Sequence, residues 1–262
     1  MARWRRTERN VLTLSLIGIG CGDPEQLTLA AIGAINAADL ILIPRKGEEK
    51  TDLAELRREI CARVLTNRKT KLVEFDLPAR DAAREDYRGG VDDWHDAVAE
   101  VWSREIKAHI GTGSRVAFLI WGDPSLYDSS LRIARRLEPL PEIEVIPGVT
   151  ALQALCAAHA IPLNEIGAPF LVTTGRQLRE KGWPAGMTTV AVMLDGGSAF
   201  QSLDPEGLQI WWGAYLGMPH QIIFAGPLSE TAATIAEARA EARQRHGWIM
   251  DCYILKRVSG EG

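Results

Sequence analysis

The tripeptide Gly-Asp-Pro occurs twice in the chain, at residues 22–24 and again at residues 122–124. An apolar run that predicts a buried strand precedes each copy, residues 11–19 before the first and residues 115–120 before the second. A segment with helical spacing follows each copy. Two such strand-to-helix junctions in one chain predict a ligand held at the carboxyl ends of parallel strands.

The composition is that of an ordinary soluble globular protein. The 262 residues are 46% apolar and 24% charged, and they suffice for one large or two modest domains. The formal net charge is -4. Because proteins that bind nucleic acids usually carry a basic excess, we expect no nucleic-acid partner.

We expect a cytoplasmic protein with no membrane association. The basic start at residues 1–6 leads into no signal-like apolar segment, and residues 11–19 are too few to span a bilayer. The cysteines are scattered without metal-type spacing, so we expect buried or idle thiols and no metal site.

In the first half, predicted strands alternate with predicted helices. The strands are residues 11–19, 40–43, 71–75, 115–120 and 142–146, and the helices are residues 24–38, 52–64, 93–110, 126–138 and 151–160. Asp23 is predicted to cap the first helix, with Pro24 at its first position and Gln26 completing a capping box. Residues 76–92 are polar and predict a long surface loop.

Strands follow one another more closely in the second half. They are predicted at residues 170–173, 189–194, 209–215, 221–224 and 248–256, with a long helix over residues 228–244. This pattern favours a mixed sheet. We therefore expect an α/β protein of two domains, residues 1–146 with a mostly parallel sheet and residues 147–262 with a mixed sheet.

The first glycine-rich loop has the pattern G-x-G-x-G at residues 18–22. A dinucleotide fingerprint requires G-x-G-x-x-G and an acidic residue at the end of the second strand, where this chain has Pro44 and Arg45. No Walker lysine follows the loop either, so NAD and ATP are disfavoured. A tight turn that only packs a helix on a sheet remains the structural alternative.

Three loops in order resemble those of the class III S-adenosylmethionine methyltransferases, the tetrapyrrole methylases. The first is the glycine-rich loop, which ends in Leu27-Thr28, the second has Gly-Asp-Pro-Ser-x-Tyr at residues 122–127, and the third has Pro-Gly-Val-Thr at residues 147–150. The resemblance covers almost the whole chain. It implies two α/β domains with S-adenosylmethionine bound in a cleft between them and S-adenosylhomocysteine as a product.

Carried over by position, the resemblance also implies the cofactor contacts. They are Cys21, Trp121, Gly122, Asp123, Leu126, Thr150, Ala151, Leu194, Gly213 and Ala214. Cys21 departs from the proline common at this position in the family, and we expect it to be a small packing residue without redox chemistry. Apolar walls around these loops would suit an adenine ring.

Further segments resemble one branch of this family. They lie at residues 46–50, 93–95, 192–196, 212–217 and 247–251. The resemblance implies methylation at C1 of a precorrin in aerobic cobalamin biosynthesis, with an acetyl group expelled as acetate. It also implies a homodimer. Water, assisted by a base, would attack the acetyl carbonyl, and the carbon freed by cleavage would accept the methyl group.

His95, Tyr127 and Arg45 are the candidate catalytic residues. The pKa of histidine lies near neutrality, so His95 is our candidate for the base, with a surface or capping histidine as the alternative. Tyr127 can orient substrate or donate a proton, with a packing role as the alternative. In related uroporphyrinogen methyltransferases an acidic catalytic residue follows the second strand, where this chain has Pro44; the adjacent Arg45 can bind a substrate carboxylate.

A polycarboxylate substrate requires several cations, and a macrocycle offers a surface on which aromatic rings stack. The further candidates are Lys46, Arg132 and Arg176 for charge and Trp94, Trp211 and Trp212 for stacking. The alternatives are solvated surface positions for the cations and core or dimer packing for at least two of the tryptophans. The competing functions are another precorrin methyltransferase, an RNA 2′-O-methyltransferase and a non-catalytic corrinoid carrier. The acidic balance disfavours RNA, and a carrier would have no need of the cofactor loops.

Overall fold

A computed structural model describes residues 11–45, 51–79, 87–111 and 113–258. The chain divides into two compact units. The first contains Met1–Gly20 and Pro24–Val149, and the second contains Cys21–Asp23 and Thr150–Gly262. Three residues of the first glycine-rich loop therefore pack with the second unit. Lys46 and the other residues of the motif at 46–50 lie outside the described residues.

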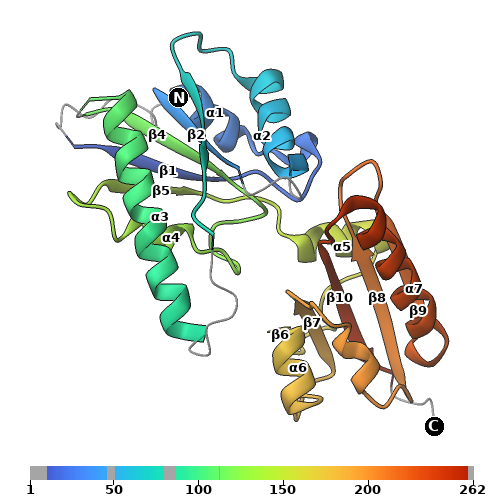
Figure 1. Cartoon of the computed structure of the whole chain (residues 1–262). Helices are drawn as coiled ribbons and strands as arrows, with labels where there is room; N and C mark the ends of the chain where they lie inside the picture. Colours follow the sequence, from blue (N-terminus) through green and yellow to red (C-terminus); the bar gives the residue numbers. More distant parts are fainter. Residues whose placement is uncertain (1–10, 46–50, 80–86, 112, 259–262) are drawn as a thin grey trace. The chain divides into compact units, whose positions relative to one another are not determined.

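The first unit is built on a parallel sheet (Figure 1). Its strands are β1 (Thr13–Gly18), β2 (Leu40–Arg45), β3 (Lys71–Asp76), β4 (Arg115–Ile120) and β5 (Glu142–Ile146). They lie in the order β3-β2-β4-β1-β5, and every neighbouring pair is parallel. All five strands predicted for this half are present. Their carboxyl ends consequently share one edge of the sheet.

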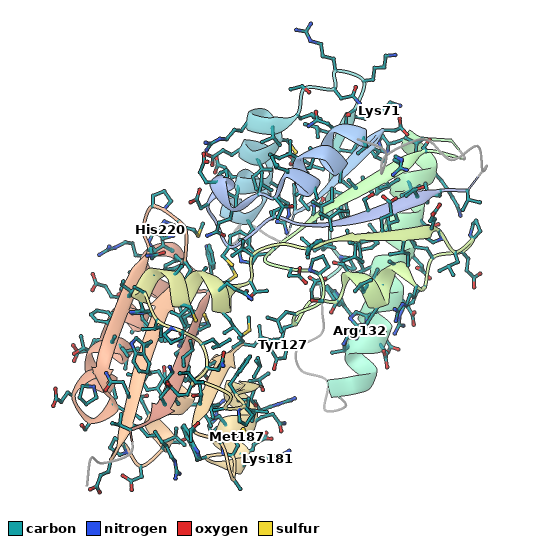
Figure 2. All side chains as sticks on the ribbon, turned by 180° about the vertical axis from the view of Figure 1, so that it is seen from behind. Lys71, Tyr127, Arg132, Lys181, Met187 and His220 are labelled. Atoms are coloured by element: carbon teal, nitrogen blue, oxygen red, sulfur yellow. The ribbon has the colours of Figure 1, made fainter. Side chains whose placement is uncertain are left out.

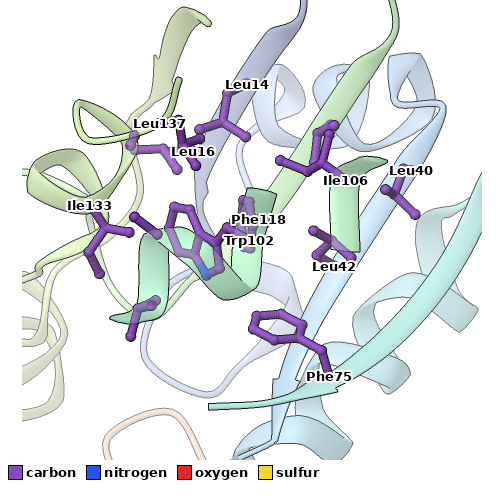
Figure 3. Packing of buried hydrophobic residues seen from close by; sticks show 14 of the residues in the cluster. Leu14, Leu16, Leu40, Leu42, Phe75, Trp102, Ile106, Phe118, Ile133 and Leu137 are labelled. Carbon is purple, nitrogen blue, oxygen red and sulfur yellow. The ribbon is translucent and has the colours of Figure 1, made fainter. Parts of the chain in front are cut away.

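Helices cover both faces of this sheet, as the apolar character of its strands requires. Helices α1 (Leu29–Ala37) and α2 (Thr51–Val64) pack on one face, and α3 (Tyr87–His109) and α4 (Ser130–Ala134) on the other. Figure 3 shows the hydrophobic core between this sheet and helices α3 and α4. In it, Trp102 of α3 stacks on Phe118 of β4 with ring centroids 3.9 Å apart. Each large side chain buried in this way contributes about 1.5–3 kcal/mol.

Three helix predictions in this unit are wrong in their bounds. Asp23 and Gln26 do not cap α1, because residues 24–26 form a separate 3-10 turn and Thr28 is the N-cap, its hydroxyl accepting from Ala31 N at 3.0 Å. Helix α3 begins at Tyr87, so the expected surface loop is shorter than residues 76–92. Helix α4 has only five residues, because the second Gly-Asp-Pro is followed by turns as far as Ser129.

The second unit has a mixed sheet in the order β6-β7-β10-β8-β9. Its strands are β6 (Leu171–Thr174), β7 (Thr189–Met193), β8 (Leu208–Ala214), β9 (Ile222–Pro227) and β10 (Asp251–Arg257). Its helices are α5 (Ala151–His159), α6 (Gly175–Lys181) and α7 (Leu228–His246), with a 3-10 turn over Ala199–Ser202. Only the β6–β7 pair is parallel. Helix α6 was not predicted from the sequence.

None of the helices in the described ranges is long and apolar enough to cross a membrane. All four cysteines are free thiols, and three of them, Cys21, Cys61 and Cys252, are buried.

Candidate active site

Three glycines bring the predicted loops of the first unit into backbone contact at the carboxyl edge of its sheet. A Cβ added at Gly148 would lie 2.2 Å from the carbonyl oxygen of Gly122, and one at Gly18 would lie 2.5 Å from Gly148 N. Gly122 N also donates to Gly20 O at 2.8 Å. No other residue type fits between these strand ends, because any Cβ would overlap main-chain atoms. The ends of β1, β4 and β5 therefore meet as bare backbone.

Asp123 joins the second loop to the third. One carboxylate oxygen accepts from Ser125 N at 2.8 Å and from the Ser125 hydroxyl, and the other accepts from Gly148 N at 2.8 Å. Burial alone would raise the pKa of Asp123, but these hydrogen bonds outweigh it and lower the pKa below its ordinary value. Asp123 is therefore an ionised clasp that fixes the relative position of two predicted cofactor loops.

The side chains on either side of Asp123 differ in exposure. Trp121 packs partly against the core beneath α1 and α2, and Leu126 is half-buried. Tyr127 is 43% exposed, has a positive φ of 52°, and its pKa is raised by partial burial. Tyr127 is labelled on the first unit in Figure 2. A tyrosine in a strained turn with its ring partly in solvent is well placed for a ligand-facing role.

The predicted contacts of the second unit meet at one edge of its sheet. Strand β10 lies between β7 and β8, and its first residue, Asp251, is opposite Ala214 at the end of β8. The end of β7, which Leu194 follows, lies at the same edge. Cys252 donates through Sγ to Ala151 O at 3.7 Å, so the start of α5 joins this group. Gly213 and Ala214 are buried and can meet a ligand only through their main chain.

Leu194 has a conformation that its neighbours must maintain. Its φ is 51° and its side chain is 63% exposed, an unfavourable combination for an unsupported leucine. The following residue, Asp195, is 4% exposed. Its carboxylate accepts from Ala199 N at 2.6 Å, from Gly197 N at 3.0 Å and from the Tyr253 hydroxyl at 2.7 Å. These bonds fold the chain back directly after Leu194.

Arg239 of α7 completes this buried network. Its Nη2 donates to Asp195 O at 2.5 Å, and its Nε donates to Asp251 Oδ2 at 2.9 Å. Trp212 Nε1 donates to the same Asp251 oxygen at 3.0 Å. Burial raises the pKa of Asp251 even though Arg239 and Trp212 act to lower it. The network ties the end of β7 to the start of β10 and to β8.

The second unit consists of two stretches of the chain, which begin at Cys21 and at Thr150. Cys21 is 3% exposed, and burial raises the pKa of its thiol to about 12, so the thiol stays protonated at neutral pH. A Cβ at Gly22 would lie 2.4 Å from Met218 Cγ. Thr150 is the N-cap of α5, and its N donates to Gln153 Oε1 at 3.1 Å. Cys21 therefore fits the expected packing role.

The three candidate catalytic residues belong to different parts of the first unit. Arg45, at the end of β2, forms an exposed ion pair with Asp76 at 2.9 Å. His95 lies on the buried face of α3 and is 2% exposed, and neither ring nitrogen has a hydrogen-bond partner among the described residues. Burial and the charge of Arg136 lower the pKa of His95, so its imidazole is neutral at pH 7.

The additional candidates fall into two groups. Arg132 and Arg176 are exposed, as binding to a solvated carboxylate would require. Trp94 donates through Nε1 to Pro78 O at 2.9 Å, and Trp211 lies under the ammonium group of Lys256. Trp212 is fully buried, so its proposed stacking on a macrocycle is wrong.

Sequence reasoning gave no role to Arg57, Asp195 or Arg239. Asp195 lay within the segment at residues 192–196 that resembles the family, but only its contacts with Gly197, Ala199 and Tyr253 show that it fixes the chain after Leu194. In the described part of the chain, no group of three histidine, cysteine, aspartate or glutamate side chains forms a cluster that could hold a metal.

Comparison with known proteins identifies the family. Residues 13–232 match the family model described as Tetrapyrrole (Corrin/Porphyrin) Methylases. The chain belongs to this family. It is 46% identical over 254 residues to precorrin-6A synthase [deacetylating] from Sinorhizobium sp, covering 95% of this chain and 97% of that protein. It is also 32% identical over 152 residues to precorrin-2 C(20)-methyltransferase from the same source, covering 56% of this chain.

Solved structures of tetrapyrrole methylases have the same fold. A protein described as related to cobalamin synthesis (CobF) from Corynebacterium diphtheriae has 38% identity and a TM-score of 0.81, over 95% of this chain and all of that one. Uroporphyrin-III C-methyl transferase from Thermus thermophilus, complexed with S-adenyl homocysteine, has 22% identity and a TM-score of 0.59 over 93% of this chain. The fold prediction is thereby confirmed, and the chain is a methyltransferase of this class.

Proposed function

We propose that the chain methylates C1 of precorrin-5 with loss of acetate, which gives precorrin-6A in aerobic cobalamin biosynthesis. One observation carries this proposal, the 46% identity with precorrin-6A synthase [deacetylating] over nearly the full length of both proteins. Identity that high over the whole chain includes the segments outside the shared cofactor motifs, where differences between substrates are expected to lie.

We propose that S-adenosylmethionine binds to Trp121, Gly122, Asp123 and Leu126 of the first unit and to Cys21, Thr150, Ala151, Leu194, Gly213 and Ala214 of the second. Bound there, it would supply an electrophilic methyl group on a sulfonium centre. The residues fit such a ligand because they offer bare glycine backbone, the N-terminus of α5, and apolar surface from Leu194. S-Adenosylhomocysteine would be the product.

For the substrate, we propose that Tyr127 and Arg45 bind and orient the tetrapyrrole and that His95 holds or accepts a proton. Arg45 can exchange its exposed Asp76 partner for a substrate carboxylate at low cost, because exposed ion pairs contribute little. A neutral imidazole is the form that a base requires. Water adds to the acetyl carbonyl, the bond to C1 breaks, acetate leaves, and the electron pair left on C1 accepts the methyl group.

Two outcomes distinguish the order of these steps. If deacetylation comes first, the enzyme releases acetate from precorrin-5 in the absence of S-adenosylmethionine. If acetate release depends strictly on S-adenosylmethionine, methylation comes first and the proposed order is wrong.

A binding measurement tests the function class. A saturating ligand that binds only the native state raises the midpoint of thermal unfolding. We expect S-adenosylmethionine and S-adenosylhomocysteine to raise it and adenosine triphosphate to leave it unchanged. No shift with either cofactor form would exclude the methyltransferase and favour a corrinoid carrier. A shift, together with turnover of a different precorrin, would favour another methyltransferase of the family.

We also propose that the protein is a cytoplasmic homodimer with a tetrapyrrole substrate. The family resemblance supports the dimer, and the four free thiols suit a reducing compartment. Light scattering coupled to size-exclusion chromatography would give twice the chain mass of 28.8 kDa. A mass equal to one chain would contradict the dimer.

A further inference from the structure

The first sheet opens between β2 and β4 near their carboxyl ends. These strands pair only from Leu40 to Leu42, whereas β2 stays paired with β3 as far as Arg45. If the register continued, residue 44 would lie opposite residue 120 and its N–H would donate to the carbonyl of Leu119. Residue 44 is proline, which has no N–H. The carbonyl of Leu119 therefore needs another donor.

Arg57 of α2 supplies that donor. Its Nε donates to Leu119 O at 2.8 Å, and its Nη1 donates to Leu53 O at 2.8 Å. The residue is only 9% exposed. Its guanidinium group therefore lies beside the opening, close to the carboxyl edge that carries the loop of Gly122.

Arg57 differs from the other buried arginines in having no acidic partner. Arg115 pairs with Glu144 at 3.0 Å, and Arg239 pairs with Asp251 at 2.9 Å. Among the described residues, no carboxylate lies within ion-pair distance of Arg57. Its Nη2 donates to no acceptor in the described part of the chain and is not sealed from solvent. An arginine has five N–H donors, so several stay available for a ligand.

A buried cation without a counter-ion is costly, and two neutral carbonyls offset only part of that cost. Burial lowers the pKa of Arg57 to about 10, and the charge of Asp128, in the loop after Tyr127, acts against that change. The group is still cationic at neutral pH.

We propose that Arg57 binds a carboxylate of the tetrapyrrole substrate. This inference rests on the proposed function, because it takes its ligand from the polycarboxylate substrate class. The planar guanidinium would use Nη1 and Nη2 for the carboxylate while Nε keeps its bond to Leu119. A purely structural Arg57, which only replaces the missing N–H of Pro44, is the competing explanation.

The test compares Arg57→Gln and Arg57→Lys with the matched control Arg58→Gln. Glutamine keeps a donor for Leu119 but removes the charge, and lysine keeps the charge but loses the planar fork. Arg58 is the next residue of the same helix and makes an exposed ion pair with Glu74 at 2.7 Å. Substrate KM, kcat and the Kd for S-adenosylmethionine would be measured for each variant.

We expect Arg57→Gln to raise the KM for precorrin-5 by about tenfold or more, the loss typical of one charge-assisted hydrogen bond. The Kd for S-adenosylmethionine should stay within about twofold of wild type, since uniform substrate binding alone is lost. The KM of Arg57→Lys should lie between the values of wild type and Arg57→Gln. The KM of Arg58→Gln should match that of wild type. An unchanged KM in Arg57→Gln, or equal losses in KM and cofactor Kd, would overturn the proposal.

Binding of uroporphyrin, a fluorescent tetrapyrrole polycarboxylate, separates this inference from the proposed function. If wild type fails to convert precorrin-5 but Arg57→Gln weakens uroporphyrin binding, the assigned reaction is wrong and the role of Arg57 stands. If wild type converts precorrin-5 and both Arg57 variants bind substrate normally, the role of Arg57 is wrong. If Arg57→Gln does not fold, a wild-type KM in Arg57→Lys would still overturn the proposal, because lysine lacks the planar guanidinium group that the proposal requires.

Discussion

At the scale of residues, Asp123 and Asp195 do similar work in the two units. Each is a buried carboxylate that accepts several hydrogen bonds and fixes the main chain beside predicted cofactor residues. Neither needs to contact the cofactor to matter for its affinity. We therefore expect Asp195 to act by positioning Leu194, and Asp123 to position the loops beside its own proposed contact with the cofactor. The effects of changing either residue should appear in cofactor binding before they appear in global stability.

Tyr253→Phe tests the network behind Leu194. The change removes only the hydroxyl that donates to Asp195 at 2.7 Å. We expect the Kd for S-adenosylmethionine to rise about fivefold, because one bond to a charged acceptor typically contributes about 1.5–3 kcal/mol and only part of that reaches the ligand. Arg245→Gln, on the surface of the same unit, is the control. An unchanged Kd in Tyr253→Phe would show that the network does not position Leu194.

Asp123→Ala tests the clasp between the second and third loops. Removing the carboxylate leaves Gly148 N and Ser125 N without their acceptor. We expect a rise of about tenfold or more in the Kd for S-adenosylmethionine, measured by calorimetry. Ser125→Ala, which removes one donor and keeps the carboxylate, should have a smaller effect. Equal effects of the two changes would argue that Asp123 contributes no more than a local turn.

At the scale of elements, the carboxyl ends of β1, β4 and β5 form one close backbone contact in the first unit. Gly148→Ala should destabilise it, because the added Cβ would lie 2.2 Å from the backbone oxygen of Gly122 and neither strand end can move freely. We expect a loss of about 2 kcal/mol or more in the free energy of unfolding, measured by urea denaturation. Gly111→Ala, where no atom lies within 4 Å of the new Cβ, should be close to neutral. Similar losses in both variants would contradict the close approach.

The sequence predicted the strands better than the helices. Strands β1, β2 and β4 are short apolar runs that are almost wholly buried, so local pattern and burial agree. Strands β3 and β5 lie at the edges of the sheet and are only partly buried. The predicted start of the helix after the first loop was wrong because the sequence contains two competing start signals. Pro24 suits a first turn, but the Thr28 hydroxyl caps the longer helix that buries Ala31 and Ile35. Helix α6 carried too little apolar periodicity to be seen.

The candidate site was predictable where it depended on motifs and not where it depended on tertiary contacts. The order of the motifs in the chain predicted the glycine loops, Leu194 after β7 and the last two residues of β8, and their contact with the cofactor stays a prediction. Arg57 could not, because its meaning comes from the missing N–H of Pro44 and the missing carboxylate partner, which only the register of β2 and β4 reveals. Arg239 likewise gains its role from distant contacts with Asp195 and Asp251.

At the scale of the whole molecule, His95 couples stability to pH. The folded protein holds the pKa of His95 below its ordinary value of 6.5, chiefly by burial, so the unfolded chain binds the proton more readily. The contribution of neutral His95 to the stability of the folded state is therefore fully present above about pH 6.5. It is lost as the pH falls through the pKa that His95 has in the folded protein. We expect wild type to lose thermal stability between pH 7.5 and 5.5 more steeply than His95→Gln. Parallel curves would show that His95 does not titrate with folding.

The proposed reaction can be followed directly through its products. The most direct measurement incubates the protein with precorrin-5 and S-adenosylmethionine carrying a ¹³C-labelled methyl group, and follows the products by NMR and mass spectrometry. We expect one labelled methyl group at C1, one free acetate per turnover and S-adenosylhomocysteine in equal amount. Labelled methyl at another carbon, or a methylated product that retains its acetyl group, would contradict it.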